Sequence, residues 1–101
     1  MDQANNDGAT PLSMAAQNGH ERCVELLLAK GAAVDQANNA GTTPLWVAAG
    51  MGREKCVQRL LEAGAEVDKA TPFGTPLSGA TKNGHENCAA LLRAAGAKDV
   101  R

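Results

Sequence analysis

The chain has 101 residues, 44% of them hydrophobic and 21% charged, and its formal net charge is -1. This length fits one domain, and the apolar content is high enough for a folded core, which excludes a disordered chain. The small net charge and the lack of a basic stripe argue against a nucleic-acid partner. Arg53, Lys55 and Arg59 are interpreted as solvated helix positions.

The cellular setting is predicted from the N-terminus and the cysteines. The first residues are polar, and no apolar run is long enough to span a bilayer, so neither a secretory signal nor a membrane partner is predicted. Three cysteines are an odd number, which argues against a disulfide framework. We therefore predict an intracellular, cytoplasmic protein. With one Trp, one Phe and no Tyr, its core should consist of Leu, Val and Ala.

A repeat of about 33 residues covers the sequence. Thr10-Pro11-Leu12 recurs as Thr43-Pro44-Leu45 and again as Thr75-Pro76-Leu77, and the second step is one residue shorter, at 32. Self-similarity at such a period is typical of solenoid proteins. The predicted organisation is a single domain over 1–101, with repeats over 2–34, 35–67 and 68–101.

The first repeat begins with a predicted helix over 11–18. Thr10 is suited to cap this helix, because its hydroxyl accepts a hydrogen bond from an unpaired amide of the first turn. Pro11 has no amide to lose at the first helical position. Gly19 is expected to end the helix in the left-handed conformation.

A second helix is predicted over 21–30, with Gly31 ending it. The polar segment 35–41 predicts a tight turn, and weak alternation around Val34 permits a short β-hairpin-like turn there without a long strand. Helices this short are marginal in isolation, so stability must come from stacking one repeat on the next. The predicted fold class is therefore an all-α helical solenoid.

The repeat resembles the ankyrin family, through strings that recur in all three units. In the first unit they are Gly8-Ala9-Thr10-Pro11-Leu12, Ala15-Ala16, Asn18-Gly19-His20, Val24-Glu25-Leu26-Leu27-Leu28 and Lys30-Gly31-Ala32. The resemblance implies a helix-turn-helix solenoid that binds another protein on a concave surface made by hairpin tips and first helices. The chain departs from the family pattern in two ways. Ser13, Trp46 and Ser78 stand where the family often has His, and the third unit is shortened.

The third repeat differs from the others at four positions. Relative to the first repeat, Met14 becomes Gly79, Ala16 becomes Thr81, Val24 becomes Ala89 and Leu28 becomes Arg93. We interpret this as lost apolar bulk on a face toward a following repeat, so that repeat three is a C-terminal cap with Thr81 and Arg93 facing water. Drift within a longer array is the alternative. The first repeat carries no such cap, which allows weak self-association through it.

Cysteine and histidine pairs do not predict a metal site or a catalytic nucleophile. His20 with Cys23 and His85 with Cys88 lie two repeats apart, whereas a metal needs about four converging ligands. Cys23, Cys56 and Cys88 share one repeat position and are interpreted as small core residues. The two histidines are expected to cap or bridge the loop between helices. The acidic residues are interpreted as solvated charges: Glu21, Glu25, Glu54, Glu62 and Glu66.

Trp46, Met51 and Phe73 are the leading candidates for a binding site. Aromatic and Met side chains are favoured at interface centres, and these three are predicted to lie near one another on the concave side. The alternative is that Trp46 fills the gap between repeats and Phe73 folds onto its shortened loop. Further candidates occupy tip and helix positions that ankyrin binders commonly use: Asn6, Asp7, Gln17, Asn18, Asn39, Ala40, Lys82 and Asn83.

The predicted function is protein binding without catalysis, and no cofactor or metal is expected. Two alternatives remain: a structural spacer or scaffold segment of a longer array, and an engineered repeat protein. Free cysteines and unequal repeat lengths argue against the engineered protein, because designers usually remove both.

Overall fold

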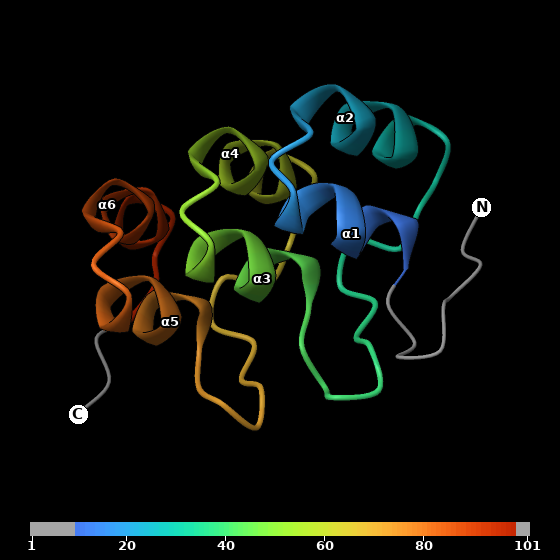
Figure 1. Ribbon diagram of the computed structural model, residues 1–101. Coiled ribbons are helices and arrows are strands. Elements are labelled where there is room, and N and C mark those ends of the chain that lie inside the picture. The colour runs from blue at the N-terminus through green and yellow to red at the C-terminus, as the bar shows by residue number, and fades with distance from the viewer. Residues whose placement is uncertain (1–9, 99–101) are drawn as a thin grey trace.

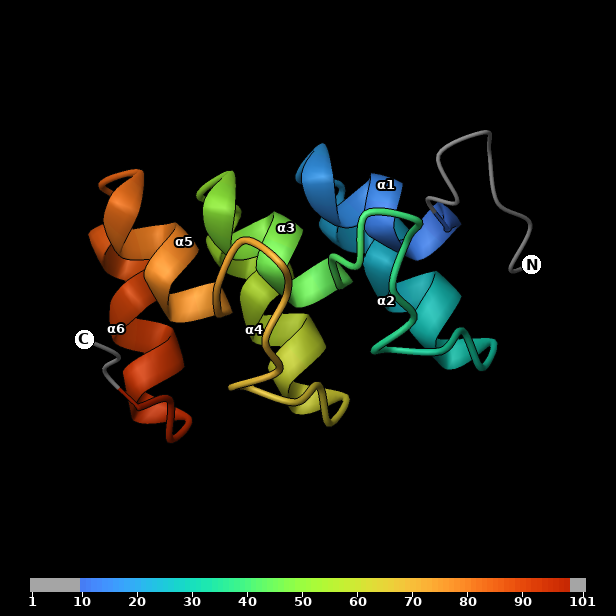
Figure 2. The ribbon, with the colours of Figure 1, turned by 90° about the horizontal axis from the view of Figure 1, so that it is seen from below.

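The computed structural model describes residues 10–98 and contains two rows of helices (Figure 1). The six helices of this part of the chain are α1 (Pro11–Gln17), α2 (Glu21–Ala29), α3 (Pro44–Gly50), α4 (Glu54–Glu62), α5 (Pro76–Lys82) and α6 (Glu86–Ala94). Each first helix packs against the second helix of its own pair and against the first helices of neighbouring pairs. The three pairs follow one another along the molecule, as the view from below shows (Figure 2). The all-α solenoid is thus confirmed.

The first helix of each pair is capped by the threonine that precedes its proline. The hydroxyl oxygens of Thr10, Thr43 and Thr75 accept hydrogen bonds of 3.1, 3.3 and 3.2 Å from the amides three residues later. Each proline occupies the first helical turn, where its missing amide costs nothing. The predicted cap is confirmed, and α1 ends at Gln17, one residue before the predicted end.

The second helices begin without side-chain caps. His20 and His85 occupy the N-cap positions of α2 and α6, yet neither makes a side-chain cap hydrogen bond within residues 10–98. The cap, one of the two roles predicted for these histidines, is therefore wrong. An acidic residue in the first turn of each helix instead complements the positive end of the helix dipole. His85 lies over the loop between α3 and α4, where a Cβ on Gly52 would be 2.7 Å from its Nδ1.

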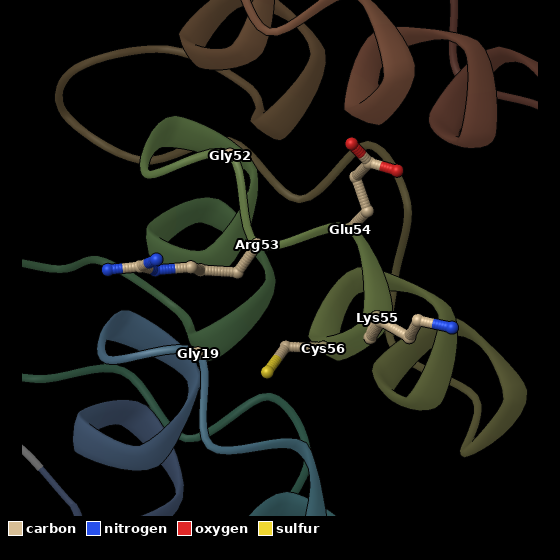
Figure 3. Close-up of a pocket in the computed structure, with 6 residues that line it drawn as sticks. All are labelled: Gly19, Gly52, Arg53, Glu54, Lys55 and Cys56. Atoms are coloured by element: carbon tan, nitrogen blue, oxygen red, sulfur yellow. The ribbon is translucent and has the colours of Figure 1, made fainter.

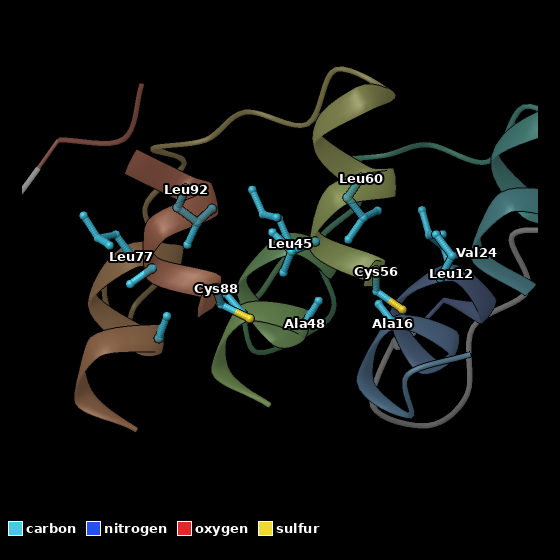
Figure 4. Packing of buried hydrophobic residues seen from close by; sticks show 14 of the residues in the cluster. Leu12, Ala16, Val24, Leu45, Ala48, Cys56, Leu60, Leu77, Cys88 and Leu92 are labelled. Atoms are coloured by element: carbon cyan, nitrogen blue, oxygen red, sulfur yellow. The ribbon is translucent and has the colours of Figure 1, made fainter. Parts of the chain in front are cut away.

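The core lies between the two rows of helices and is built from aliphatic residues (Figure 4). Its largest fully buried members come from both rows and all three pairs: Leu12, Leu45, Leu60, Leu92, Val24 and Val57. Cys56 and Cys88 are also buried there, as predicted, but Cys23 is exposed, so the prediction of a core role is wrong for that one cysteine. The small Ala48 and Ala49 are fully buried and allow close approach of helices.

The long loops contain turns and little β structure. The segment around Val34 forms turns instead of the β-hairpin-like turn predicted there. In the loop before α3, the Asn38 side-chain oxygen accepts from the amides of Ala40 at 2.9 Å and Thr42 at 3.1 Å, which closes the turn locally. Within the described part of the chain, an isolated antiparallel bridge joins Thr71 and Gly74 in the next loop.

Several charges predicted to be solvated instead join neighbouring repeats. The guanidinium of Arg59 on α4 forms ion pairs with Glu21 at 2.8 Å and Glu25 at 2.7 Å on α2, and with Glu62 at 3.1 Å on its own helix. The prediction of solvated charges is therefore wrong for Arg59, Glu21 and Glu25, whereas the Glu62 side chain is 66% exposed, as predicted. Arg53 Nε likewise donates to the main-chain oxygen of Gln17 at 3.0 Å. Apart from Glu62, these partners are far apart in sequence, so only stacking brings them together.

The four positions that distinguish the third repeat differ in burial. Thr81 and Arg93 are exposed, as predicted. Gly79 and Ala89 are buried, so their lost bulk does not lie on an outward face and that part of the prediction is wrong. Gly79 faces the preceding repeat, where it lies against the Trp46 indole. Within residues 10–98, none of the helices has the length and apolar character needed to cross a membrane.

Candidate functional site

A shallow groove of about 280 Å³ lies where the first helices meet the loop before α3. Its lining comes from all three repeats: Gln17, Asn38, Thr42, Trp46, Val47, Gly50, Met51 and Asn83. Four of the sequence candidates, Gln17, Trp46, Met51 and Asn83, thus meet at one place. None of the lining residues is titratable, so the groove is suited to apolar contacts and not to proton transfer.

Trp46 belongs to α3, and its indole lies between α3 and α5. A Cβ at Gly79 would be 3.5 Å from its Nε1, so the absence of a side chain at residue 79 leaves space for the ring. Nε1 is buried and has no hydrogen-bond partner among the described residues. One edge of the indole therefore packs between repeats, as the alternative interpretation proposed, while the residue also borders the groove.

Phe73 projects from the loop before α5 and contacts the same indole. Its ring centroid is 5.7 Å from that of Trp46, with the planes tilted by 38°. The Phe73 side chain nevertheless remains 63% exposed. A tight turn fixes it, because the Thr71 hydroxyl accepts from the Phe73 amide at 3.0 Å and donates to the Gly74 oxygen at 2.8 Å. The polar groups of the shortened loop bond to one another, which leaves the ring face open.

Met51 borders the groove from the C-terminal end of α3. It is the C-cap residue, and its amide donates to the Val47 oxygen at 3.0 Å. Its side chain is 47% exposed. Met51 and Phe73 are therefore two large apolar side chains that remain open to solvent beside Trp46.

The polar groups around the groove are held by hydrogen bonds between repeats. Asn83 Nδ2 donates to the main-chain oxygen of Gly50 at 2.9 Å. One repeat earlier, the main-chain oxygen of Gln17 holds the equivalent place and accepts from Arg53. Both bonds satisfy carbonyls at the end of a first helix, which lack intrahelical partners. The groove wall is thus tied to the stack of repeats.

The repeat pattern, the stacked helix pairs and this geometry agree with the comparison of the sequence with protein families. A model for ankyrin repeats in three copies matches residues 1–71, which is more than half of the chain. The chain belongs to the ankyrin repeat family. A comparison with curated proteins finds no match. Ankyrin repeat domains are generally protein–protein interaction modules and are typically non-catalytic.

The remaining sequence candidates of this ankyrin domain lie beside the groove or outside the described residues. Asn18, Asn39, Ala40 and Lys82 are exposed but do not line the groove, whereas the exposed Gln17 does. Asn6 and Asp7 fall outside residues 10–98.

Sequence reasoning missed four of the groove residues. These are Asn38, Thr42, Val47 and Gly50. Gly50 lies four residues after Trp46 and Val47 lies four residues before Met51, so helical spacing from these two candidates was the available signal.

A second hollow of the ankyrin domain, of about 240 Å³, lies between the loops of the first two repeats (Figure 3). Gly19 lines one side, and residues 52–56 line the other. Desolvation raises the pKa of the Cys56 thiol, so it is a poor nucleophile near neutral pH. Within residues 10–98, no three His, Cys, Asp or Glu residues lie close enough together to hold a metal ion.

Proposed function

We propose that this ankyrin domain binds a partner protein on the face formed by its first helices and loops, with the groove beside Trp46 at the centre. The proposal rests on two large apolar side chains beside the groove that are exposed to solvent, Met51 and Phe73. Met51 and Phe73 are 47% and 63% exposed, although large hydrophobic residues elsewhere in the domain are mostly buried. Water-exposed aromatic and Met side chains beside a groove are typical of interface centres.

Rigidity supports the same function. The groove spans three repeats, and Asn83 and Arg53 tie their loops together through hydrogen bonds. A surface that is already ordered loses little conformational entropy when a partner binds, so more of the contact energy appears as affinity. The expected partner places an apolar side chain against Met51 and Phe73.

A polar rim around this centre is part of the proposal. Asn39 and Ala40 are exposed at the turn of the loop before α3, and Asn18 and Lys82 are exposed at the ends of α1 and α5. Rim residues of this kind exclude water and set specificity, but usually contribute little energy. We therefore expect small effects from single substitutions at these positions.

Affinity capture with three forms of the domain tests the proposal. The wild-type domain is compared with a Met51→Ala, Phe73→Ala variant and with a Leu26→Ala control. Leu26 is a matched control because it is also an exposed large hydrophobic, at 55%, but lies on α2 away from the groove. Proteins captured by the wild type and the control but lost with the double variant would identify partners of the groove. Equal recovery by all three forms would overturn the proposal.

Trp46 provides a direct second measurement. It is the only tryptophan, and the chain has no tyrosine, so the intrinsic fluorescence reports on the groove alone. Titration with a captured partner should shift the Trp46 emission as the groove becomes covered. A partner that binds without any change in emission would indicate that it uses another surface.

A further inference from the structure

The two rows of helices differ in charge. Within residues 10–98, the first helices α1 and α3 contain no charged residue, and α5 contains one, Lys82. The acidic side chains of the helices all belong to the second helices: Glu21, Glu25, Glu54, Glu62 and Glu86. In the described part of the chain, the row of first helices that borders the groove is therefore free of acidic side chains.

The other acidic residues within 10–98 lie in the loops that follow α2 and α4. The Asp35 carboxylate accepts from the Glu66 amide at 3.2 and 3.4 Å, and Asp68 Oδ1 accepts from the Lys98 amide at 3.1 Å. These hydrogen bonds tie both aspartates to the segment that follows the next second helix. The residues that line the groove include none of these acids.

Lys82 lies on the groove side of the domain because of its place in the repeat. It is the last residue of α5, as Gln17 is of α1 and Gly50 is of α3. Both of those residues line the groove, and Asn83, which follows Lys82 directly, lines it as well. Lys82 is exposed, and no acidic group in the described part of the chain pairs with it. Its ammonium group is therefore open to a partner beside the groove.

Arg53 supplies a second cation at the same end of the first helices. Its Nε donates to the main-chain oxygen of Gln17 at 3.0 Å, which holds the guanidinium beside a groove residue. Its side chain points away from those of Glu54 and Lys55 (Figure 3). Its two Nη groups make no hydrogen bond within residues 10–98. A guanidinium with free Nη groups is well suited to bind a carboxylate.

Asn38 adds an uncharged donor to these two cations. Its side-chain oxygen accepts from the amides of Ala40 and Thr42, which fixes the orientation of the side-chain amide. Nδ2 is therefore left as a donor, unpaired among the described residues, on a residue that lines the groove. Within residues 10–98, the groove is thus flanked by unpaired donors from two repeats and by no carboxylate.

We propose that the segment of the partner protein that fills the groove is acidic. It places an apolar side chain against Met51 and Phe73, and the carboxylate of an Asp or Glu toward Lys82 and Arg53. This inference rests on the proposed binding function and adds the chemistry of the partner.

Charge complementarity is the reason for an acidic segment. Opposite charges speed the encounter of two proteins and suppress wrong partners, because like charges that meet at an interface repel. A basic segment would meet Lys82 and Arg53 without any acidic group beside the groove, among the described residues, to offset the repulsion. A protein carboxylate is favoured over nucleic-acid phosphates, since nucleic acids are bound by neutralising many phosphates and the groove itself is uncharged.

Selection from a phage-displayed library of random peptides tests the proposal. Peptides selected on the wild-type domain should combine Asp or Glu with a large apolar residue. One selected peptide is then synthesised in two forms, one with its acidic residues and one with the matching amides in their place. The amide form should bind about tenfold more weakly at low salt. The difference should shrink in high salt, where exposed charges are screened.

Lys82→Glu is the variant of the domain, and Lys55→Glu is its matched control. Lys55 is also exposed, but it lies on α4 and its side chain points away from that of Arg53 (Figure 3). Both substitutions change the net charge equally. Lys82→Glu should weaken binding of the acidic peptide about fivefold or more, and Lys55→Glu should leave it nearly unchanged. A peptide with lysines in place of its acidic residues should prefer the Lys82→Glu domain to the wild type.

Arg53→Gln should also weaken binding of the acidic peptide, and circular dichroism checks that this variant keeps its helices. Selected peptides that bind a Met51→Ala, Phe73→Ala domain as tightly as the wild type would overturn the groove proposal, and this one with it. Peptides that require Met51 and Phe73 but are neutral, basic or insensitive to Lys82→Glu would overturn the acidic partner alone. Displacement of the acidic peptide by an equal concentration of a DNA oligonucleotide would overturn it too, since any polyanion would then suffice.

Discussion

Gly79 of α5 lies against the indole of Trp46 of α3, and a Cβ built at Gly79 would be 3.5 Å from Trp46 Nε1. That distance is an ordinary van der Waals contact, so a methyl group fits. Glycine inside a helix costs about 0.5–1 kcal/mol relative to alanine, because it loses more backbone freedom on folding. Gly79→Ala should therefore increase the free energy of unfolding by about that amount, as measured by urea denaturation.

Gly52→Ala is the contrasting variant. Gly52 has φ +73, and a Cβ there would be 2.7 Å from His85 Nδ1. Both the left-handed backbone and the clash oppose a side chain, so we expect a loss of more than about 1 kcal/mol. If Gly79→Ala destabilised the domain as Gly52→Ala should, the contact between residue 79 and the indole would be tighter than described.

Because of Arg59, the stability of the packing between the first two repeats should depend on salt concentration. Its hydrogen bond with Glu25 is the main cause of its raised pKa, and a further ion pair joins it to Glu21. Arg59→Met should lower the thermal midpoint at low ionic strength. The difference from the wild type should shrink in about 1 M salt, where the screening length falls to about 3 Å.

Arg22→Met is the control for Arg59, because Arg22 is an exposed arginine on α2. Its substitution should change the thermal midpoint little at either salt concentration. An Arg59→Met effect of equal size at low and high salt would show that packing of its side chain, and not charge, joins α2 to α4.

The three cysteines should react at very different rates. Cys23 is exposed, whereas Cys56 and Cys88 are buried and their thiol pKa values are raised by desolvation. A thiol-specific reagent should modify one thiol per native chain quickly and the other two only when the chain opens. Mass spectrometry of the labelled peptides identifies the fast site. Comparable labelling of all three cysteines in the native chain would contradict the buried positions.

Cys88 should make stability fall at high pH. Burial raises its pKa from 9.0 to about 11, and the charge of Glu54 acts in the same direction. Above about pH 9 the unfolded chain releases this proton while the folded chain retains it, so the unfolded state gains relative stability until about pH 11. The stabilising contribution is complete below pH 9 and is lost through this window.

Urea midpoints at pH 8 and near pH 10.5 measure the effect of Cys88. A Cys88→Ala chain should be less stable overall, because it leaves a small cavity, but its midpoint should fall less between the two pH values. Equal falls in both chains would assign the pH dependence to other groups.

The helix starts and the repeat could be predicted because they depend on neighbours in the sequence. Thr43 caps α3 through an amide three residues away, and Pro44 follows it directly. The left-handed Gly19 ends the first helix for an equally local reason. Trp46, Met51 and Phe73 were also identified as candidates from residue type and position in the repeat.

The sequence by itself determined the repeat period, the caps and the ankyrin-type fold, since each follows from local backbone chemistry. Only the tertiary structure decided which side of each helix is covered. Cys23 and Cys56 hold one repeat position, yet one is exposed and the other buried. Gly79 faces Trp46 and not a following repeat. The physical reason is that the burial of a residue depends on the neighbouring repeat. The residue type alone does not tell whether that neighbour covers it.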